Sequence, residues 1–170
     1  MNPIQATEIL EKDFTEAEVW EAIRESDGNK APGPDGFNMM CFQKGWKVMK
    51  EYIMNFMKKF HKNSRLSYGI NCSFVTLIPK RDIPSSIMEY RPISLINSEY
   101  KILSKVLANG LKQVLPNVTD KVQSAFLRGR NILDGVLIAN EVVDWWKKSK
   151  KRELILKLGF EKAYDSVNWN

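Results

Sequence analysis

A regular apolar stripe in the first third of the sequence is the feature that most constrains the fold. Seven apolar side chains recur at alternating intervals of three and four residues, the spacing that aligns side chains along one side of an α-helix. We therefore predict a long amphipathic helix over residues 39–60, with Gly45 as a candidate break into two helices. A stripe of this kind usually faces a core, and the lysines on its other faces are usually only solvated, so the segment predicts no binding site. The stripe consists of Met39, Phe42, Trp46, Met49, Ile53, Phe56 and Phe60.

The composition is that of a folded protein with a basic balance. Apolar residues make up 44% of the 170 residues and charged residues 27%, which argues against wholesale disorder. A chain of this length is expected to form one domain, or one domain and part of another. The 26 Lys and Arg exceed the 20 Asp and Glu, giving a net charge of +6. This excess weakly favours a nucleic-acid partner.

Cysteine and histidine are too sparse for a zinc site. Cys41 and Cys72 are not part of a paired motif, and His61 is the only histidine. We therefore expect both cysteines to be reduced thiols and the protein to be intracellular, in the nucleus or the cytoplasm. The first residues lack the apolar region of a secretory signal, and no stretch approaches about 18 apolar residues, so we expect no membrane association.

Local signals predict an α+β fold with short antiparallel strands. A first helix begins at a capping box between Thr15 and Glu18, with Gly28 as its candidate C-terminal cap. Pro92 confines the second of two predicted strands to a sheet edge or to an irregular stretch. The further elements are strands over residues 74–78 and 90–96 joined by a polar hairpin-like loop, helices over 98–115 (ending at Pro116) and 133–147, a charged connector over 147–153, and a buried strand over 154–158.

Cations at the ends of the two predicted strands suggest phosphate binding. Lys80 and Arg91 each lie where extended backbone meets a turn, and two cations on adjacent strands can grip a triphosphate. Arg128 and Arg130, on either side of Gly129, also suit phosphate contacts. Each of these residues could equally be an ordinary surface charge.

The loop NKAPGPDG, residues 29–36, and the end of the chain carry the most distinctive patterns. Gly33 and Gly36 permit positive φ in the loop, which by itself could simply join two helices. At the end, the apolar run of residues 154–158 is followed by Gly159 and then FEKAYDSV. A strand followed by such a turn is where α/β enzymes place metal-binding carboxylates.

These patterns together resemble the reverse transcriptases of non-LTR (LINE-type) retrotransposons. The resemblance extends over most of the chain, from residue 14 to residue 169, and its motifs occur in the family's order. It implies a helix-rich fingers region with short antiparallel strands over residues 1–150, and the first strand of a polymerase palm over 151–170. The matching segments are NKAPGPDG, LIPK with YRPISL, QSAFLRGR and LGFEKAYDSV.

The resemblance also implies roles for individual residues. Gly159 occupies the position of the family's metal-binding aspartate, so no catalytic residue of this motif is intact. The residues implied at the incoming nucleotide are Lys80, Arg91, Phe160 and Tyr164, and those implied near the nucleic acid are Lys30, Gln123, Arg128 and Arg130. One departure is Gly110, where the family usually has an arginine.

The expected function is therefore that of a truncated, degenerate reverse transcriptase domain without activity of its own. The intact family joins a deoxynucleoside triphosphate to a primer with two Mg²⁺ ions, whereas this chain is expected to hold no metal or other cofactor. Its expected partners are RNA template and RNA/DNA hybrid, bound weakly and without sequence preference. Two alternatives remain: a segment of a longer active polymerase, or a non-catalytic module that binds RNA or hybrid.

Overall fold

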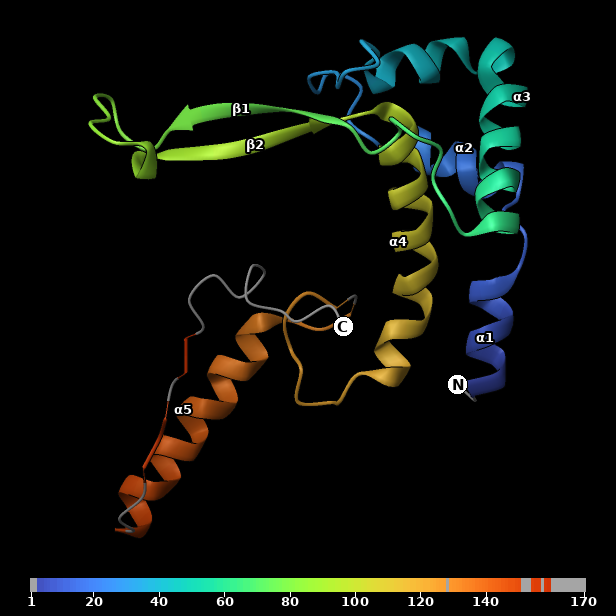
Figure 1. Ribbon diagram of the computed structural model, residues 1–170. Helices are drawn as coiled ribbons and strands as arrows, with labels where there is room; N and C mark the ends of the chain where they lie inside the picture. Colours follow the sequence, from blue (N-terminus) through green and yellow to red (C-terminus); the bar gives the residue numbers. More distant parts are fainter. Residues whose placement is uncertain (1–2, 128, 151–153, 157, 160–170) are drawn as a thin grey trace. The chain divides into compact units, whose positions relative to one another are not determined.

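The computed structural model describes residues 3–127, 129–150, 154–156 and 158–159. Within these residues the fold is α+β, as predicted, with helices and one antiparallel pair of strands (Figure 1). Contacts divide the chain into a first unit over residues 1–119 and a second over 120–170, each described separately below. The elements are α1 (Pro3–Glu11), α2 (Glu16–Arg24), α3 (Met39–Asn63), β1 (Ser73–Pro79), the short 3-10 helix η1 (Ile87–Glu89), β2 (Tyr90–Ile96), α4 (Ser98–Val118) and α5 (Ile132–Ser149).

The boundary predicted after residue 150, between a fingers region and a palm, cannot be compared directly with the boundary between these two units after residue 119. The units follow contacts between residues, whereas the prediction concerns functional regions of a polymerase. That boundary therefore stays a prediction.

The core of the first unit lies between α2, α3 and α4. The stripe predicted on α3 faces this core, with Ile53 fully buried and Phe42 almost so. Trp46 of α3 stacks on Trp20 of α2, their ring centroids 5.2 Å apart. The side chains that form the buried cluster are Val19, Ala22, Ile23, Met39, Phe42, Ile53, Met57, Ile102, Leu103 and Val106.

The long helix α3 is continuous, so the candidate break at Gly45 was wrong. The helix runs 25 residues from an N-cap at Asn38, whose side chain accepts a hydrogen bond from the Cys41 amide. Its apolar face spans the core on both sides of Gly45, and this packing outweighs the cost of one interior glycine, about 1 kcal/mol. Figure 1 shows that the helix axis changes direction along its length.

The start of α2 was predicted correctly and its end was not. The capping box between Thr15 and Glu18 is present, with both reciprocal hydrogen bonds. The helix ends at Arg24 and not close to Gly28. Beyond this end, the Gln43 side chain of α3 takes the place of further helical hydrogen bonds, because its Nε2 donates to the carbonyl oxygens of Ile23 at 2.9 Å and Ser26 at 2.8 Å. Helix α1 had no counterpart among the predicted elements.

Helix α4 continues through Pro116 to Val118, although Pro116 was predicted to stop it. Proline lacks an amide donor and its ring crowds the carbonyl four residues earlier, but Pro116 lies in the last turn of the helix, where only two helical residues follow it. The turn is closed one step later, where both the amide and the hydroxyl of Thr119 donate to the Leu115 carbonyl oxygen.

The predicted strand pair forms a hairpin that extends from the helices of the first unit (Figure 1). Strands β1 and β2 pair antiparallel, from Ser73 opposite Ile96 at the base to Pro79 opposite Tyr90 at the far end. Every residue of β1 is exposed, so the pair is not packed on the core. Both strands are edges of this sheet, which is the position predicted for a strand containing Pro92.

The buried strand predicted over residues 154–158 is not present among the residues described there. Leu154, Ile155, Leu156 and Leu158 have irregular backbone and are 53–86% exposed. A strand needs a neighbour for its backbone groups, and the sheet described here contains only β1 and β2. In the second unit, Asn131 is the N-cap of α5, and its side chain accepts a hydrogen bond from the Leu133 amide at 3.0 Å. Helix α5 has no buried side chain among those described.

Candidate nucleic-acid interface

The loop over residues 29–36 is fastened to the junction between β2 and α4. The Asp35 carboxylate accepts a hydrogen bond from the Ser98 amide at 2.5 Å, at the first residue of α4. In return, the Asp35 amide donates to the Asn97 side-chain oxygen at 3.0 Å. Asn97 uses its own amide group elsewhere, donating to the Gly69 carbonyl at 2.9 Å. A carboxylate from a distant loop thus caps the positive end of the α4 dipole.

Gly33 allows this loop to approach the junction closely. A Cβ at this position would lie 2.3 Å from the Ile96 carbonyl oxygen and 2.7 Å from the Asn97 nitrogen. The glycine is therefore needed for contact with backbone, and positive φ occurs instead at Gly36, where φ is 73°. Ser98, fully buried, donates from its hydroxyl to the Phe37 carbonyl at 2.7 Å. The loop consequently fixes the base of the hairpin.

Lys30 lies at the base of the hairpin, away from the other predicted phosphate contacts of the first unit. It is exposed and lines a shallow depression that also involves Ile96, Lys101 and Lys105. Lys101 donates to the Ala31 carbonyl at 3.1 Å, which holds it against the loop. The depression is also lined by the acidic residues Glu25 and Asp27, so Lys30 lies among charges of both signs.

Lys80 and Arg91 come together at the far end of the hairpin. Arg91 is opposite Ile78 in the strand register, and the Lys80 amide continues the ladder by donating to the Glu89 carbonyl at 2.7 Å. Because residues 78 and 80 alternate to the same face, Lys80 and Arg91 are diagonal neighbours on that face, with about 7–8 Å between their backbones. Seven residues of strand, at about 3.3 Å each, separate this end from the base.

The two cations differ in how they are engaged. The Lys80 ammonium donates to the Met88 carbonyl at 2.7 Å, within the loop at the hairpin end. The nearby carboxylate of Glu89 is paired with Arg81 at 3.0 Å. Arg91 is exposed and forms no ion pair with the described part of the chain. Its guanidinium is therefore available for an anion.

In the second unit, the Arg130 guanidinium supports its own loop. It donates to the carbonyl oxygens of Gln123 at 2.7 Å and Asp120 at 2.5 Å. The Gln123 side chain in turn donates to the Ala125 carbonyl at 3.1 Å. Both residues thus have a structural role, and their contact with nucleic acid stays a prediction. Arg128, the other arginine predicted here, lies outside the described residues.

The position of the expected metal ligand offers no side-chain carboxylate. Gly159 has no side chain, and a Cβ built on it would meet nothing within 4 Å. Among the described residues, no group of three or more His, Cys, Asp and Glu lies close enough to hold a metal ion. Whether the chain holds a metal ion therefore stays a prediction. Phe160 and Tyr164, predicted to contact a nucleotide, lie outside the described residues.

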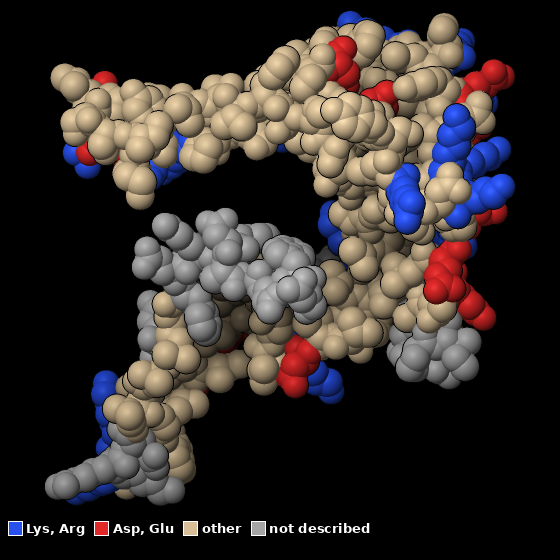
Figure 2. All heavy atoms as spheres, viewed as in Figure 1, with Lys and Arg blue, Asp and Glu red and all other residues tan. Residues whose placement is uncertain are grey.

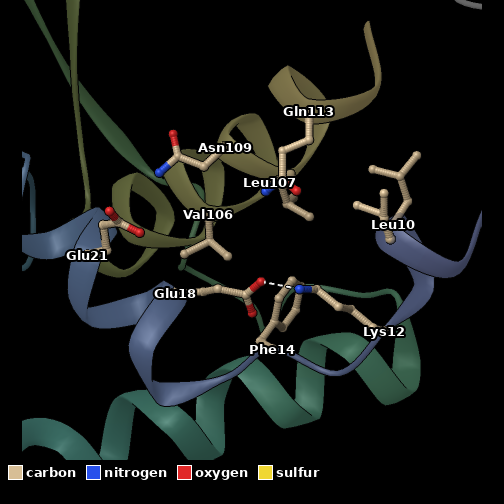
Figure 3. A pocket seen from close by; sticks show the side chains of 11 residues that line it. Leu10, Lys12, Phe14, Glu18, Glu21, Val106, Leu107, Asn109 and Gln113 are labelled. Carbon is tan, nitrogen blue, oxygen red and sulfur yellow. Dashed lines mark ion pairs between the residues drawn. The ribbon is translucent and has the colours of Figure 1, made fainter. Parts of the chain in front are cut away.

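A small cavity between α1, α2 and α4 lies apart from these cations (Figure 3). Its volume is about 80 Å³, and its walls combine apolar side chains with the Lys12–Glu18 ion pair, 2.6 Å long. Burial alone would raise the pKa of the Glu18 carboxyl. The hydrogen bonds from Lys12 and Thr15, with the charge of Lys12, have the larger combined effect and lower this pKa below its ordinary value. Gly110 lines the cavity, with Leu10 3.9 Å from where its Cβ would be. The ion pair and the capping box occupy Lys12 and Glu18, so these two groups stabilise the start of α2.

Comparison with known proteins identifies the family. The model of the reverse transcriptase (RNA-dependent DNA polymerase) family matches residues 78–170, more than half of the chain. The chain belongs to the reverse transcriptase family. The matched residues include the hairpin end with Lys80 and Arg91 and the position of Gly159.

Two relatives of this reverse transcriptase domain come from mobile elements. One is an uncharacterized 149 kDa protein of transposon TX1 from Xenopus laevis, 30% identical over 95% of the chain. The other is a retrovirus-related Pol polyprotein from the type-1 retrotransposable element R1 of Bradysia coprophila, 28% identical over 94% of the chain. These origins agree with the LINE-type resemblance. The chain spans 12% and 16% of the lengths of these relatives.

The fastening of the loop to α4 is the part of the interface that the sequence did not reveal. The Asp-Gly pair at residues 35–36 signals a turn, but nothing local indicates that Asp35 caps a helix 63 residues later.

No helix in the described part of this reverse transcriptase domain is long and apolar enough to cross a membrane.

Proposed function

We propose that this chain holds nucleic acid as the fingers region of a LINE-type reverse transcriptase and does not itself catalyse nucleotide addition. The observation that carries the proposal is Gly159, which stands where the family motif has a metal-binding aspartate. Loss of one carboxylate weakens metal stabilisation worth several kcal/mol. Since each ~1.4 kcal/mol changes a rate tenfold, this loss alone slows nucleotide addition by about 10³-fold.

The holding function rests on the cations of the first unit. Arg91 is exposed at the end of the hairpin without an ion pair among the described residues, and Lys80 lies diagonally beside it. A guanidinium binds phosphate through two parallel hydrogen bonds, and an ammonium adds a point charge. The fastened loop at residues 29–36 supports this arrangement by fixing the base of the hairpin on α4. Contacts of this kind address phosphates and not bases, so binding is independent of sequence.

Primer extension on an RNA template tests the catalytic half of the proposal. The purified chain, supplied with deoxynucleoside triphosphates and either Mg²⁺ or Mn²⁺, is expected to incorporate nothing above background while an active reverse transcriptase in parallel extends the primer. Template-dependent incorporation would overturn this half.

Binding of an RNA/DNA hybrid tests the holding half. Replacement of Arg91 by alanine is expected to weaken hybrid binding about tenfold, consistent with loss of one charge-assisted contact of about 1.5 kcal/mol. The matched control is Arg81→Ala at the same hairpin end, because Arg81 is already paired with Glu89. Equal affinities for the two variants would contradict a specific role of Arg91.

A second candidate is a segment of a longer active polymerase. The lengths of the two relatives favour it, since the chain spans 12% and 16% of them. Incorporation by a longer protein that retains Gly159 would support this candidate over the first.

A further inference from the structure

The outward side of α3 carries a stripe of exposed lysines that the predicted interface does not use. Helical spacing places these lysines opposite the buried side chains Phe42, Ile53 and Met57. Figure 2 shows Lys and Arg side chains gathered over α3. The only acidic residue within α3 is Glu51. The lysine stripe consists of Lys44, Lys47, Lys58, Lys59 and Lys62.

The charges of the lysine stripe are not neutralised by the protein. Elsewhere in the first unit, basic side chains form ion pairs: Lys50 with Glu16 at 3.0 Å, Lys12 with Glu18 at 2.6 Å and Lys105 with Glu25 at 3.6 Å. None of the five stripe lysines has such a partner among the described residues. Glu51 lies on the same side of α3, four residues after Lys47, and leaves a net excess of four positive charges along this side. The remaining cations repel one another, so the surface gains most from a polyanion that lies along it.

The stripe is long and is divided into two groups. Lys44 and Lys62 are 18 residues apart, which corresponds to about 27 Å measured along the helix at ~1.5 Å per residue. The change in direction of the helix axis makes the straight-line distance shorter (Figure 1). One group lies near the start of the helix, and the other, with Lys58 and Lys59, lies near its end. A nucleic-acid backbone offers a phosphate every few ångströms over such a length. Flexible ammonium groups suit it because they bind charge without demanding a fixed geometry.

Other anionic partners fit the stripe less well. A helix that lies on a membrane inserts its apolar face, whereas the apolar face of α3 is occupied by the core. Protein interfaces favour aromatic residues and arginine and are depleted in lysine. On this side of α3 the large exposed apolar side chains are Val48 and Tyr52, and the Tyr52 hydroxyl already donates to Glu99 at 2.7 Å.

We propose that the lysine stripe of α3 is a second RNA-binding surface, which holds the sugar-phosphate backbone without reading its sequence. The proposal deepens, and rests on, the proposed function of holding nucleic acid. The stripe is separate from the end of the hairpin, since α3 packs in the helical core of the first unit and the hairpin extends from it (Figure 1).

The salt dependence of RNA binding provides the test. The probe is a labelled, mixed-sequence single-stranded RNA, and the variant is K58Q/K59Q/K62Q in the full chain. Each phosphate contact contributes about −0.7 to the slope of log affinity against log salt concentration. Loss of three contacts is therefore expected to make the slope shallower by about 2 and to weaken binding roughly tenfold at low salt. The charge-preserving variant K58R/K59R/K62R is expected to bind as the unaltered chain does.

A matched control removes the same charge from another helix. K147Q/K148Q/K150Q lowers the net charge by three at the exposed end of α5 and is expected to change the slope by less than half as much. If K58Q/K59Q/K62Q keeps the slope and affinity of the unaltered chain, the lysine stripe is not an RNA-binding surface, while the proposed function stands. If the two glutamine variants show the same loss of RNA affinity and the same change in slope, the effect comes from net charge and the proposal fails. If the unaltered, folded chain binds no RNA, the proposed function itself fails.

Discussion

Replacement of Gly33 by alanine tests whether the loop over residues 29–36 fastens the hairpin base to α4. The added Cβ would lie 2.3 Å from the Ile96 carbonyl oxygen and 2.4 Å from its carbon, so backbone must move by about 1 Å. Overpacking of this kind costs about 1–3 kcal/mol, and disturbing one hydrogen bond between Asp35 and the junction adds about 1 kcal/mol. We therefore expect a loss of about 3 kcal/mol in the free energy of unfolding.

Urea unfolding followed by helical circular dichroism measures this loss. With an m-value of about 2 kcal/mol/M, the midpoint is expected to fall by about 1.5 M at unchanged m. Gly45→Ala is the matched control: its Cβ would meet only the flexible Met49 side chain at 3.4 Å, and helix propensity favours alanine by about 1 kcal/mol. The control is expected to raise the midpoint. A midpoint for Gly33→Ala at or above that of the unaltered chain would refute the fastened loop.

Three further predictions concern helix ends and the cavity. Asp35→Ala is expected to lower stability by about 2 kcal/mol in urea unfolding, because it leaves the Ser98 amide without its acceptor; no loss would exclude this cap. The pKa of Glu18 is lowered in the folded chain, so the stability that its carboxylate contributes is present above the ordinary glutamate pKa and is lost as pH falls through the lowered value. Glu18→Gln is therefore expected to flatten the fall of the urea midpoint at acid pH. A midpoint that falls as steeply in the variant as in the unaltered chain would contradict this contribution. Gly110→Ala is expected to raise the melting temperature, because Gly110 lies in the interior of α4, where alanine is the better helix former, and the added Cβ would lie 3.9 Å from Leu10 of α1. A lower melting temperature would contradict this packing.

The elements predicted correctly are those with local signals. The stripe of α3 repeats every three to four residues, the capping box of α2 lies within four residues, and the two strands are bounded by turn residues. The predicted strand over residues 154–158 failed because apolar composition indicates burial but does not supply a neighbouring strand. Helix α1 was not among the elements predicted from the sequence.

The candidate interface was accessible from sequence only in part. Lys80 and Arg91 were named because each lies at a predicted strand end and because the resemblance implies a phosphate contact there. The register makes them neighbours, and their contact with phosphate stays a prediction. The cap that Asp35 provides to α4 joins residues 63 positions apart, which no local pattern encodes. The lysine stripe was assigned no role because solvated and ligand-binding lysines look alike in sequence. The structure adds that these lysines form no ion pair with the described residues, and this observation motivates the proposal.

The affinity of the unaltered chain for RNA, measured over a series of salt concentrations, tests the central claim most directly. Circular dichroism first establishes that the sample is folded. The account predicts binding that is equal for RNAs of different sequence and that weakens steeply as salt rises, by about 0.7 to 0.9 in log–log slope for each phosphate contacted. Binding that is absent, or that does not change with salt, would contradict the claim that this reverse transcriptase domain holds nucleic acid through its cations.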